Sequence, residues 1–295
     1  MFLAQSADWG VMADRWPELD DERFRVWADL VEQRAGILIP EERKGFLASG
    51  LRMRMQETGA GDYDAYYRRM AAEHAWSEEW TQLVDRLTVH ETSFFRHEPS
   101  LRLLDEQVVP ELLARRNALQ VWSVGCATGE EPYSLAMLIQ EHIEIAGSGC
   151  LFGITATDIS QPALQTARAG EYGGRRIETI PVDMRVRFCE ELGDGRIRIA
   201  ERLRRRICFA QLNVLKAGGF PLRDLDLVYC QNMLIYFPRY QRLQIVEILA
   251  QRLAPGGVLI LGPGDLPCWS HPEFERIRFE GTLAFRRRGA GTANA

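Results

Sequence analysis

The stretch W-S-V-G-C-A-T-G-E-E-P-Y-S-L at positions 122–135 decides the fold. An apolar, β-branched run, 119–121, precedes it. Apolar residues then recur at helical spacing, at Tyr133, Leu135, Ala136, Leu138, Ile139 and Ile143. A strand, a tight turn of small residues and a helix form the first unit of a nucleotide-type α/β sheet. Gly125 and Gly129 let the backbone of this turn approach a ligand closely.

Two carboxylates, Glu130 and Glu131, stand where a dinucleotide loop presents bare amides to a pyrophosphate. They would repel a phosphate, and the loop also lacks the G-x-G-x-x-G spacing, so a nicotinamide oxidoreductase is disfavoured. A ligand with a cationic centre and ribose hydroxyls fits better, and S-adenosylmethionine is such a ligand. The alternative is that both acids only stabilise the N-terminus of the helix against its dipole.

Composition is that of an ordinary soluble globular protein, with 46% hydrophobic and 26% charged residues among 295. The 36 basic and 41 acidic residues give a net charge of −5, which does not argue for nucleic acid. The sequence has no run near the ~20 apolar residues that span a bilayer, and no signal-peptide order at its start. The 6 scattered cysteines suit a reducing compartment. We expect a cytoplasmic protein without a metal site or membrane insertion.

Helical periodicity dominates the first part of the chain. It predicts helices from Asp21 to about Gly36, from Pro40 through Met55, from Tyr63, and around Trp76 to Leu87. These define an N-terminal all-α domain, 1–90, ahead of a second domain, 91–295. The second helix carries a basic face made of Arg43, Lys44, Arg52 and Arg54. This face is either a docking surface for an acidic partner or a solvated helix surface.

The segment 87–99 reads L-T-V-H-E-T-S-F-F-R-H-E-P and links the two domains. Its two phenylalanines would anchor it to a core, and Arg96 follows them directly. A helix from Ser100 then leads to Pro110, and the first strand comes next.

A second strand, 151–157, ends at Asp158. A carboxylate at the carboxyl end of the second strand of an α/β sheet can accept hydrogen bonds from ribose hydroxyls. The alternative is a cap for the helix from Pro162, a role for which Ser160 also qualifies. Capping needs only one of the two residues, so we assign Asp158 to ribose binding.

Residues 170–219 then interrupt the helix–strand alternation. The segment 196–200 alternates polar and apolar residues behind a turn at 193–195, which predicts a half-exposed strand. We interpret this region as a small inserted β excursion that binds a partner. The main sheet resumes with the predicted strands 207–212, 226–230 and 258–261, the last after a turn at 254–257, and closes with a hairpin over 274–285.

Six motifs occur in a fixed order along the chain: T-S-F-F-R (92–96), G-C-A-T-G-E-E-P-Y-S (125–134), A-T-D-I-S (156–160), L-N-V (212–214), C-Q-N-M-L-I-Y-F (230–237) and L-A-P-G-G-V-L-I-L-G (253–262). Together they resemble the chemotaxis-receptor protein-glutamate O-methyltransferase (CheR) family, from about Asp21 to Phe285. The resemblance implies a doubly wound methyltransferase-type sheet with an N-terminal all-α domain and a small inserted β-subdomain at about 171–206.

The resemblance also implies an activity. The family transfers the methyl group of S-adenosylmethionine to glutamate side chains on the cytoplasmic helical bundle of chemoreceptors, in sensory adaptation, and releases S-adenosylhomocysteine. It implies that Arg96 and Tyr236 lie beside the transferable methyl group. The basic helix, 43–54, resembles the family's receptor-facing helix. The positions implied to contact the cofactor are His90, Thr92, Arg96, Glu130, Glu131, Asp158, Asn213, Gln231 and Asn232.

Three departures from the family pattern stand out. His90 replaces the usual asparagine, Gln231 replaces the usual arginine, and G-P-G-D at 262–265 replaces G-H-S-E. The first two affect cofactor positions. Arg96, Asp158 and Tyr236 are retained, so we expect activity.

Methylation of a carboxylate needs no strong general base, because glutamate titrates near ~4.3 and is already ionised. None of the 5 histidines therefore has to be catalytic. We expect Arg96 to hold the acceptor carboxylate through charge-assisted hydrogen bonds, with the Tyr236 hydroxyl aligning it. Arg96 could instead pair with the cofactor carboxylate or form a structural salt bridge, and Tyr236 could be core packing.

Two other functions share the cofactor motifs. A methyltransferase acting on a small molecule or RNA would need neither the basic helical face nor the β excursion. A cofactor-binding adaptor that has lost catalysis is the second, suggested by His90 and Gln231.

Overall fold

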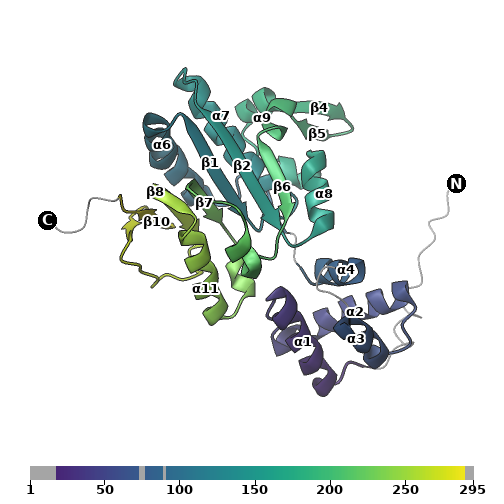
Figure 1. The fold of residues 1–295 in the computed structure, drawn as a ribbon. Helices are drawn as coiled ribbons and strands as arrows, with labels where there is room; N and C mark the ends of the chain where they lie inside the picture. Colours follow the sequence, from purple (N-terminus) through teal and green to yellow (C-terminus); the bar gives the residue numbers. More distant parts are fainter. Residues whose placement is uncertain (1–17, 73–76, 89–90, 290–295) are drawn as a thin grey trace. The chain divides into compact units, whose positions relative to one another are not determined.

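The computed structural model describes residues 18–72, 77–88 and 91–289. The chain divides into two compact units, with the boundary between Leu87 and Thr88 (Figure 1). The first unit is helical, and the second contains two β-sheets. No helix in the described ranges is long and apolar enough to cross a membrane.

The helical unit contains α1 (Asp21–Ala35), α2 (Lys44–Thr58), α3 (Tyr63–Ala72) and α4 (Glu78–Leu87), with a short 3₁₀ turn (Glu41–Arg43) before α2. Asp20 caps α1 by accepting a hydrogen bond from the backbone N–H of Arg23 at 2.8 Å. Gly36 ends the helix in the left-handed conformation, with φ of 80°. The core of the unit is made of Trp27, Leu47, Leu51, Met55, Tyr63, Tyr66, Met70 and Leu83, all at most 1% exposed.

One member of the predicted basic face of α2 lies inside this unit. Arg54 is 9% exposed, and its guanidinium pairs with Glu79 of α4, with an Nε–Oε1 distance of 3.1 Å, and with Glu57. Lys44 pairs with Asp21 of α1. The prediction that Arg54 faces outward is wrong, because a carboxylate from another helix compensates a buried charge that helical spacing cannot reveal.

The second unit is built on a seven-stranded sheet with the order β6-β2-β1-β7-β8-β10-β9. Its strands are β1 (Ala118–Val124), β2 (Leu151–Asp158), β6 (Ile207–Gln211), β7 (Leu225–Cys230), β8 (Leu253–Leu261), β9 (Phe274–Ile277) and β10 (Leu283–Arg287). β6, β2, β1, β7 and β8 pair in parallel, whereas β10 pairs antiparallel with β8 and β9. The strand order reverses between β1 and β7, which is where a doubly wound sheet binds its ligand.

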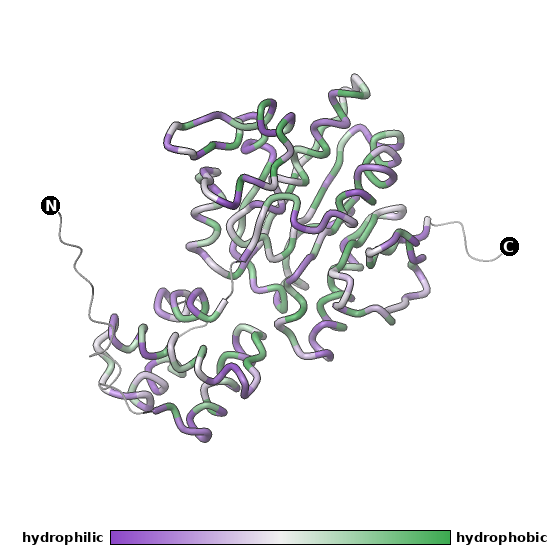
Figure 2. The backbone as a smooth tube through the Cα atoms, turned by 180° about the vertical axis from the view of Figure 1, so that it is seen from behind, coloured by the Kyte–Doolittle hydropathy of each residue, from purple (hydrophilic) through white to green (hydrophobic). Residues whose placement is uncertain are grey.

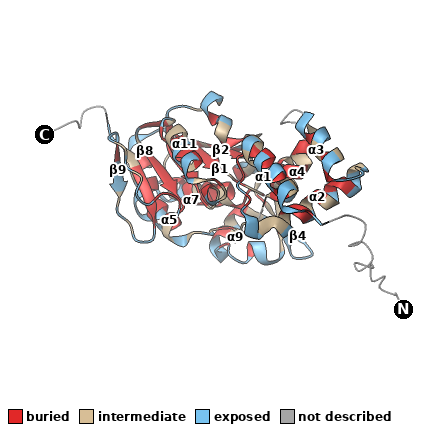
Figure 3. Cartoon of the chain, turned by 90° about the horizontal axis from the view of Figure 1, so that it is seen from below, coloured by how far each residue is buried: buried red, intermediate tan, exposed pale blue. Residues whose placement is uncertain are grey.

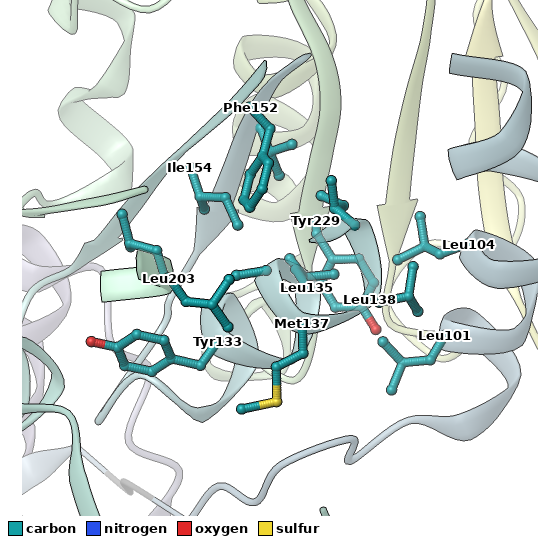
Figure 4. Close-up of a cluster of buried hydrophobic side chains, with 14 of the residues drawn as sticks. Leu101, Leu104, Tyr133, Leu135, Met137, Leu138, Phe152, Ile154, Leu203 and Tyr229 are labelled. Carbon is teal, nitrogen blue, oxygen red and sulfur yellow. The ribbon is translucent and has the colours of Figure 1, made fainter. Parts of the chain in front are cut away.

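Helices cover this sheet on both faces. They are α5 (Glu98–Leu103), α6 (Val109–Arg115), α7 (Glu130–Ile145), α8 (Gln161–Ala169) and α11 (Arg239–Ala250). Side chains alternate along the strands, so β7 sends Leu227 and Tyr229 into one apolar cluster and Val228 into the other. The first cluster packs under α5 and α7 (Figure 4). The central strands are hydrophobic and buried, as parallel strands between helices must be (Figures 2 and 3).

Two local predictions in this unit are wrong. The helix expected to stop at Pro110 continues to Arg115 as α6, because a π-helical turn (Leu104–Val108) widens the backbone just before the proline. Residues 254–257, predicted as a turn, lie within β8 at a register shift against β7. A Cβ on Gly257 would be 2.6 Å from the carbonyl oxygen of Leu225, so this bulge needs a glycine.

The excursion predicted after α8 forms a separate three-stranded sheet with the order β3-β5-β4. It contains β3 (Glu171–Gly173), a 3₁₀ turn (Gly174–Ile177), α9 (Val182–Phe188), β4 (Cys189–Gly193), β5 (Arg196–Ile199) and α10 (Glu201–Arg204). β5 is half-exposed as predicted, with Ile197 and Ile199 fully buried. The lobe also contains α9, which the sequence did not suggest. Arg187 of α9 binds Glu141 and Glu144 of α7, which fixes the lobe to the main sheet.

Candidate active site

The loop after β1 is held against the end of β2 by its own backbone. The N–H groups of Gly125 and Cys126 donate to the carbonyl oxygen of Thr157 at 2.8 and 3.0 Å. The N–H of Ala127 donates to Oδ2 of Asp158 at 2.8 Å, and Ala127 adopts a left-handed φ of 45°. The glycine-rich turn is therefore a fixed structure that is tied to a predicted ligand residue.

The loop after β7 meets the loop after β1 at the point where the strand order reverses. A Cβ on Gly125 would be 2.9 Å from Cβ of Met233, so the two loops are in direct contact. Asn232 has a left-handed φ of 55°, a strained conformation that is common at functional sites. Gln231 is 6% exposed, and its Nε2 donates to the carbonyl oxygen of Leu261 at 2.9 Å. It therefore braces the ends of β7 and β8.

Glu131 provides the acid best suited to bind a cation. Its Oε1 accepts a hydrogen bond from Oγ of Ser123 at 2.6 Å. Burial raises the pKa of Glu131 to about 8, while the Ser123 hydrogen bond and the charge of Arg96 oppose the rise and the negative charge of Asp158 adds to it. No ion pair of Glu131 occurs in the described ranges. A bound cation would relieve this cost and restore the ionised form.

Glu130 lies in a different environment, although it is the next residue. It is 0% exposed, and its Oε2 accepts a hydrogen bond from Oγ1 of Thr128 at 2.7 Å. Its Oε1 is 3.4 Å from Nη1 of Arg176, which belongs to the 3₁₀ turn of the inserted lobe. Burial raises the pKa of Glu130, and Arg176 opposes the rise. Glu130 therefore connects the loop after β1 to the inserted lobe.

The segment with the two phenylalanines places Arg96 beside this loop. Phe94 is fully buried, and the N–H of Phe95 donates to Oγ of Ser134 on α7 at 3.0 Å. Phe95 has a left-handed φ of 51°, which redirects the chain at this point. Arg96 is exposed, and its Nη1 donates to the carbonyl oxygen of Glu91 at 2.6 Å. The charge of Arg96 lowers the pKa of Glu131, so the guanidinium lies within electrostatic range of the acidic loop.

Asp158 and Ser160 divide the two roles that the sequence left open between them. The hydroxyl of Ser160 caps α8 by accepting from the N–H of Ala163 at 3.1 Å. The Asp158 carboxylate accepts from the N–H groups of Ala127 and Ser160, at 2.8 and 2.9 Å. Each carboxylate oxygen can accept more than one hydrogen bond, so these two bonds do not by themselves exclude ribose hydroxyls as further donors. This division of roles supports a ligand role for Asp158.

Two of the other predicted residues, Asn213 and Tyr236, follow strands of the same sheet. Asn213, 4% exposed, comes after β6 and accepts from the N–H of Leu215 at 3.0 Å. Tyr236 is half-buried at the end of a 3₁₀ turn (Leu234–Tyr236) after β7, and it packs against the second apolar cluster. Thr92 is half-buried ahead of the phenylalanines. His90 lies outside the described residues.

Tyr172 of β3 belongs to the site, although it is not among the residues predicted from the sequence. Its hydroxyl donates to the carbonyl oxygen of Thr128 at 2.7 Å, and its ring meets Phe94 edge to face at 4.9 Å. A Cβ on Gly129 would be 2.8 Å from the Tyr172 hydroxyl oxygen. The tyrosine thus supports both the ligand loop and the segment that carries Arg96. These contacts are tertiary, and the sequence contains no local signal for them.

The strand order, the antiparallel strand β10 between β8 and β9, and the acidic loop at the reversal point define a methyltransferase of the doubly wound type. The family comparison agrees with this class. The profile described as CheR methyltransferase, SAM binding domain, matches residues 90–277, and the profile described as CheR methyltransferase, all-alpha domain, matches residues 22–88. The chain belongs to the CheR methyltransferase family, and its cofactor is S-adenosylmethionine.

Curated relatives cover most of the chain. The chemotaxis protein methyltransferase Cher2 of Pseudomonas putida is 32% identical over 253 residues, which are 84% of this chain and 90% of the relative. Chemotaxis protein methyltransferase 1 of Pseudomonas aeruginosa is 32% identical over 255 residues, 83% of this chain and 89% of the relative. A chemotaxis protein methyltransferase of Vibrio parahaemolyticus is 28% identical over 263 residues, 88% of this chain and 94% of the relative.

The residues present fit S-adenosylmethionine. Glu131 is a half-buried acid whose pKa is raised by desolvation, which suits a cationic amino group. Asp158 stands at the end of β2, where a ribose is bound in doubly wound folds. Gly125 keeps the loop free of a side chain where it meets the neighbouring loop.

Proposed function

We propose that this protein transfers the methyl group of S-adenosylmethionine to glutamate side chains in the cytoplasmic domains of chemoreceptors, forming methyl esters. The observation that carries the proposal is an acidic side chain, Glu131, within electrostatic range of an exposed arginine, Arg96. Glu131 is suited to a cation, and the exposed guanidinium of Arg96 lies close enough to shift the pKa of Glu131. An anionic acceptor can therefore be held beside a cationic donor. The printed names of the relatives support a chemotaxis substrate.

The chain's own residues act by positioning. Glu131 would hold the amino group of the cofactor and Asp158 its ribose, and the bound cofactor supplies an electrophilic methyl group. Arg96 orients the acceptor carboxylate through charge-assisted hydrogen bonds, and the Tyr236 hydroxyl aligns it. The acceptor is already ionised at neutral pH, so no side chain has to remove a proton. Orientation of this kind can lower the free-energy barrier of the reaction by roughly 7–11 kcal/mol.

In this proposal the cofactor set is narrower than the sequence alone suggests. Glu131 would bind the cationic amino group of the cofactor. Glu130 instead stabilises the loop after β1 through its contacts with Thr128 and Arg176. Gln231 would support the site without contacting the cofactor, because its side chain is buried and hydrogen-bonded to the end of β8.

We assign the remaining parts of the chain to the receptor. The helical unit would face the receptor through Arg43 and Arg52 of its 3₁₀ turn and second helix, which stay half-exposed, and without the buried Arg54. The β-subdomain at 171–206 would hold a further part of the partner. Both assignments extend the family likeness of 22–88 and 90–277.

The test uses the purified chain, S-adenosylmethionine with a labelled methyl group, and a panel of receptor cytoplasmic domains. We expect a base-labile label, released as methanol, and methyl esters on glutamate by peptide mass spectrometry. Arg96→Lys keeps the charge but loses the planar fork, so turnover should fall at least tenfold. Label that is stable to base, or that appears only on RNA or small molecules, would contradict the proposal.

A further inference from the structure

Large apolar side chains remain exposed on one short stretch beside the proposed active site. Ile235 is 51% exposed, Tyr240 62% and Leu243 42%. Together with Arg239, which is also exposed, they form a surface that we call the α11 rim. Apolar side chains that are exposed on the same part of a surface can mark a contact with another protein.

The α11 rim lies at the edge of the sheet where the site residues are found. Ile235 directly precedes Tyr236 in the 3₁₀ turn after β7. α11 begins at Arg239, so its first turns start from the same edge. Tyr240 and Leu243 are three positions apart and share one face, opposite the face that buries Ile245 and Leu249.

Arg242 holds the two parts of the rim together. Its Nε donates to the carbonyl oxygen of Phe237 at 2.7 Å, and its Nη2 donates to the carbonyl oxygen of Ile235 at 3.3 Å. The first turn of α11 is thus bonded to the 3₁₀ turn that carries Tyr236. A rim fixed in this way can bind a partner without first becoming ordered.

The charge of the rim is positive. Arg239 forms no ion pair within the described part of the chain, so its guanidinium is available to a partner. Tyrosine and arginine are among the residues enriched in protein interfaces. The complement of such a surface is an amphipathic helix with apolar positions three or four apart and carboxylates beside them.

We propose that the α11 rim seats an acidic, amphipathic receptor helix so that one of its glutamates reaches Tyr236 and Arg96. The proposal rests on the proposed function, since it names the surface that presents the acceptor. Apolar contacts to Tyr240 and Leu243 set the register of the helix, and Arg239 pairs with a carboxylate near the acceptor. The rim therefore determines which glutamates are methylated.

The experiment compares steady-state methyl transfer to a receptor cytoplasmic domain by the full chain and its variants. Tyr240→Ala with Leu243→Ala should raise KM for the receptor roughly tenfold or more, as loss of interface anchors does. Arg239→Glu should also raise KM for the receptor, and this increase should become smaller as salt is added. The matched controls are Ile145→Ala and Leu151→Ala, since these residues are 75% and 56% exposed at the opposite edge of the sheet, where α7 ends and β2 begins.

We expect the controls to leave KM unchanged and all variants to bind S-adenosylmethionine with the wild-type Kd in calorimetry. A receptor KM within twofold of wild type for both rim variants would overturn the inference. So would a cofactor Kd that rises in parallel with KM, because that would mean a structural role. If wild type itself esterifies no receptor glutamate, the proposed function fails first; if wild type and rim variants methylate equally well, only this inference fails.

Discussion

Protonation of Glu131 should make cofactor binding depend on pH. In the ligand-free protein, burial raises the pKa of Glu131 from 4.5 to about 8. The bound cofactor brings a positive charge to this carboxyl, so it favours the ionised form and lowers the pKa. Ionised Glu131 is about one hundredth of the ligand-free population at pH 6 and about one half at pH 8. Affinity for S-adenosylmethionine should therefore rise about fifty-fold across this interval.

The raised pKa of Glu131 also makes the stability of the ligand-free fold depend on pH. The pKa of this acid is higher in the folded state than in the unfolded state, so the folded chain binds more protons between pH 4.5 and about 8. The contribution of Glu131 to stability consequently falls as pH rises through that range. Saturating cofactor should remove much of this loss.

Calorimetry at pH 6, 7 and 8, in buffers of different ionisation enthalpy, measures both the affinity and the protons released. Near pH 7, wild type should release close to one proton on binding. Glu131→Gln should bind weakly and lose most of the pH dependence, and it also corrects for titration of the cofactor's own amino group. A variant that keeps the wild-type slope, or a wild-type affinity that is flat from pH 6 to 8, would refute the reasoning.

Three further predictions concern the supports of the site and of the helical unit. Tyr172→Phe removes the hydrogen bond to the carbonyl oxygen of Thr128 and should weaken cofactor binding several-fold in calorimetry while lowering stability by about 1 kcal/mol; equal affinity would exclude a supporting role. Gly129→Ala combines a φ of 98° with a Cβ 2.8 Å from its neighbours and should destabilise the second unit by about 1–3 kcal/mol, whereas Gly147→Ala, with nothing within 4 Å, should cost less in the same denaturant titration. Arg54→Ala leaves a buried carboxylate without its partner and should destabilise the helical unit by about 3–5 kcal/mol in chemical denaturation; a loss below 1 kcal/mol would mean that the pair is not buried in solution.

Local signals explain which parts of the fold the sequence predicts. α1 runs from a capping aspartate to Gly36, and both ends depend on neighbouring residues only. The half-exposed strand β5 follows from simple alternation behind a glycine turn. α9 could not be predicted because two of its seven residues, Val182 and Val186, are apolar but lie on the exposed face, where polar residues would be expected.

In the candidate site, too, the sequence predicts the features that depend on topology or neighbouring residues and not those that depend on tertiary contacts. The candidate ligand residues at strand ends could be proposed from the sequence because a doubly wound topology brings those ends together. The sequence could not separate Glu130 from Glu131, since the difference depends on Arg176 of the inserted lobe and on Ser123 beneath the loop. Helical spacing could not predict the burial of Arg54 for the same reason, because the compensating carboxylate comes from another helix.

The central claim is that a cation and an anionic acceptor meet between the acidic loop and Arg96. A crystal structure of the chain with S-adenosylhomocysteine tests it most directly. We predict the amino group of the product beside Glu131, its ribose hydroxyls on Asp158, and its sulfur facing the side of the site where Arg96 and Tyr236 lie. Product bound elsewhere, or an Arg96 side chain turned away from the sulfur, would contradict the account.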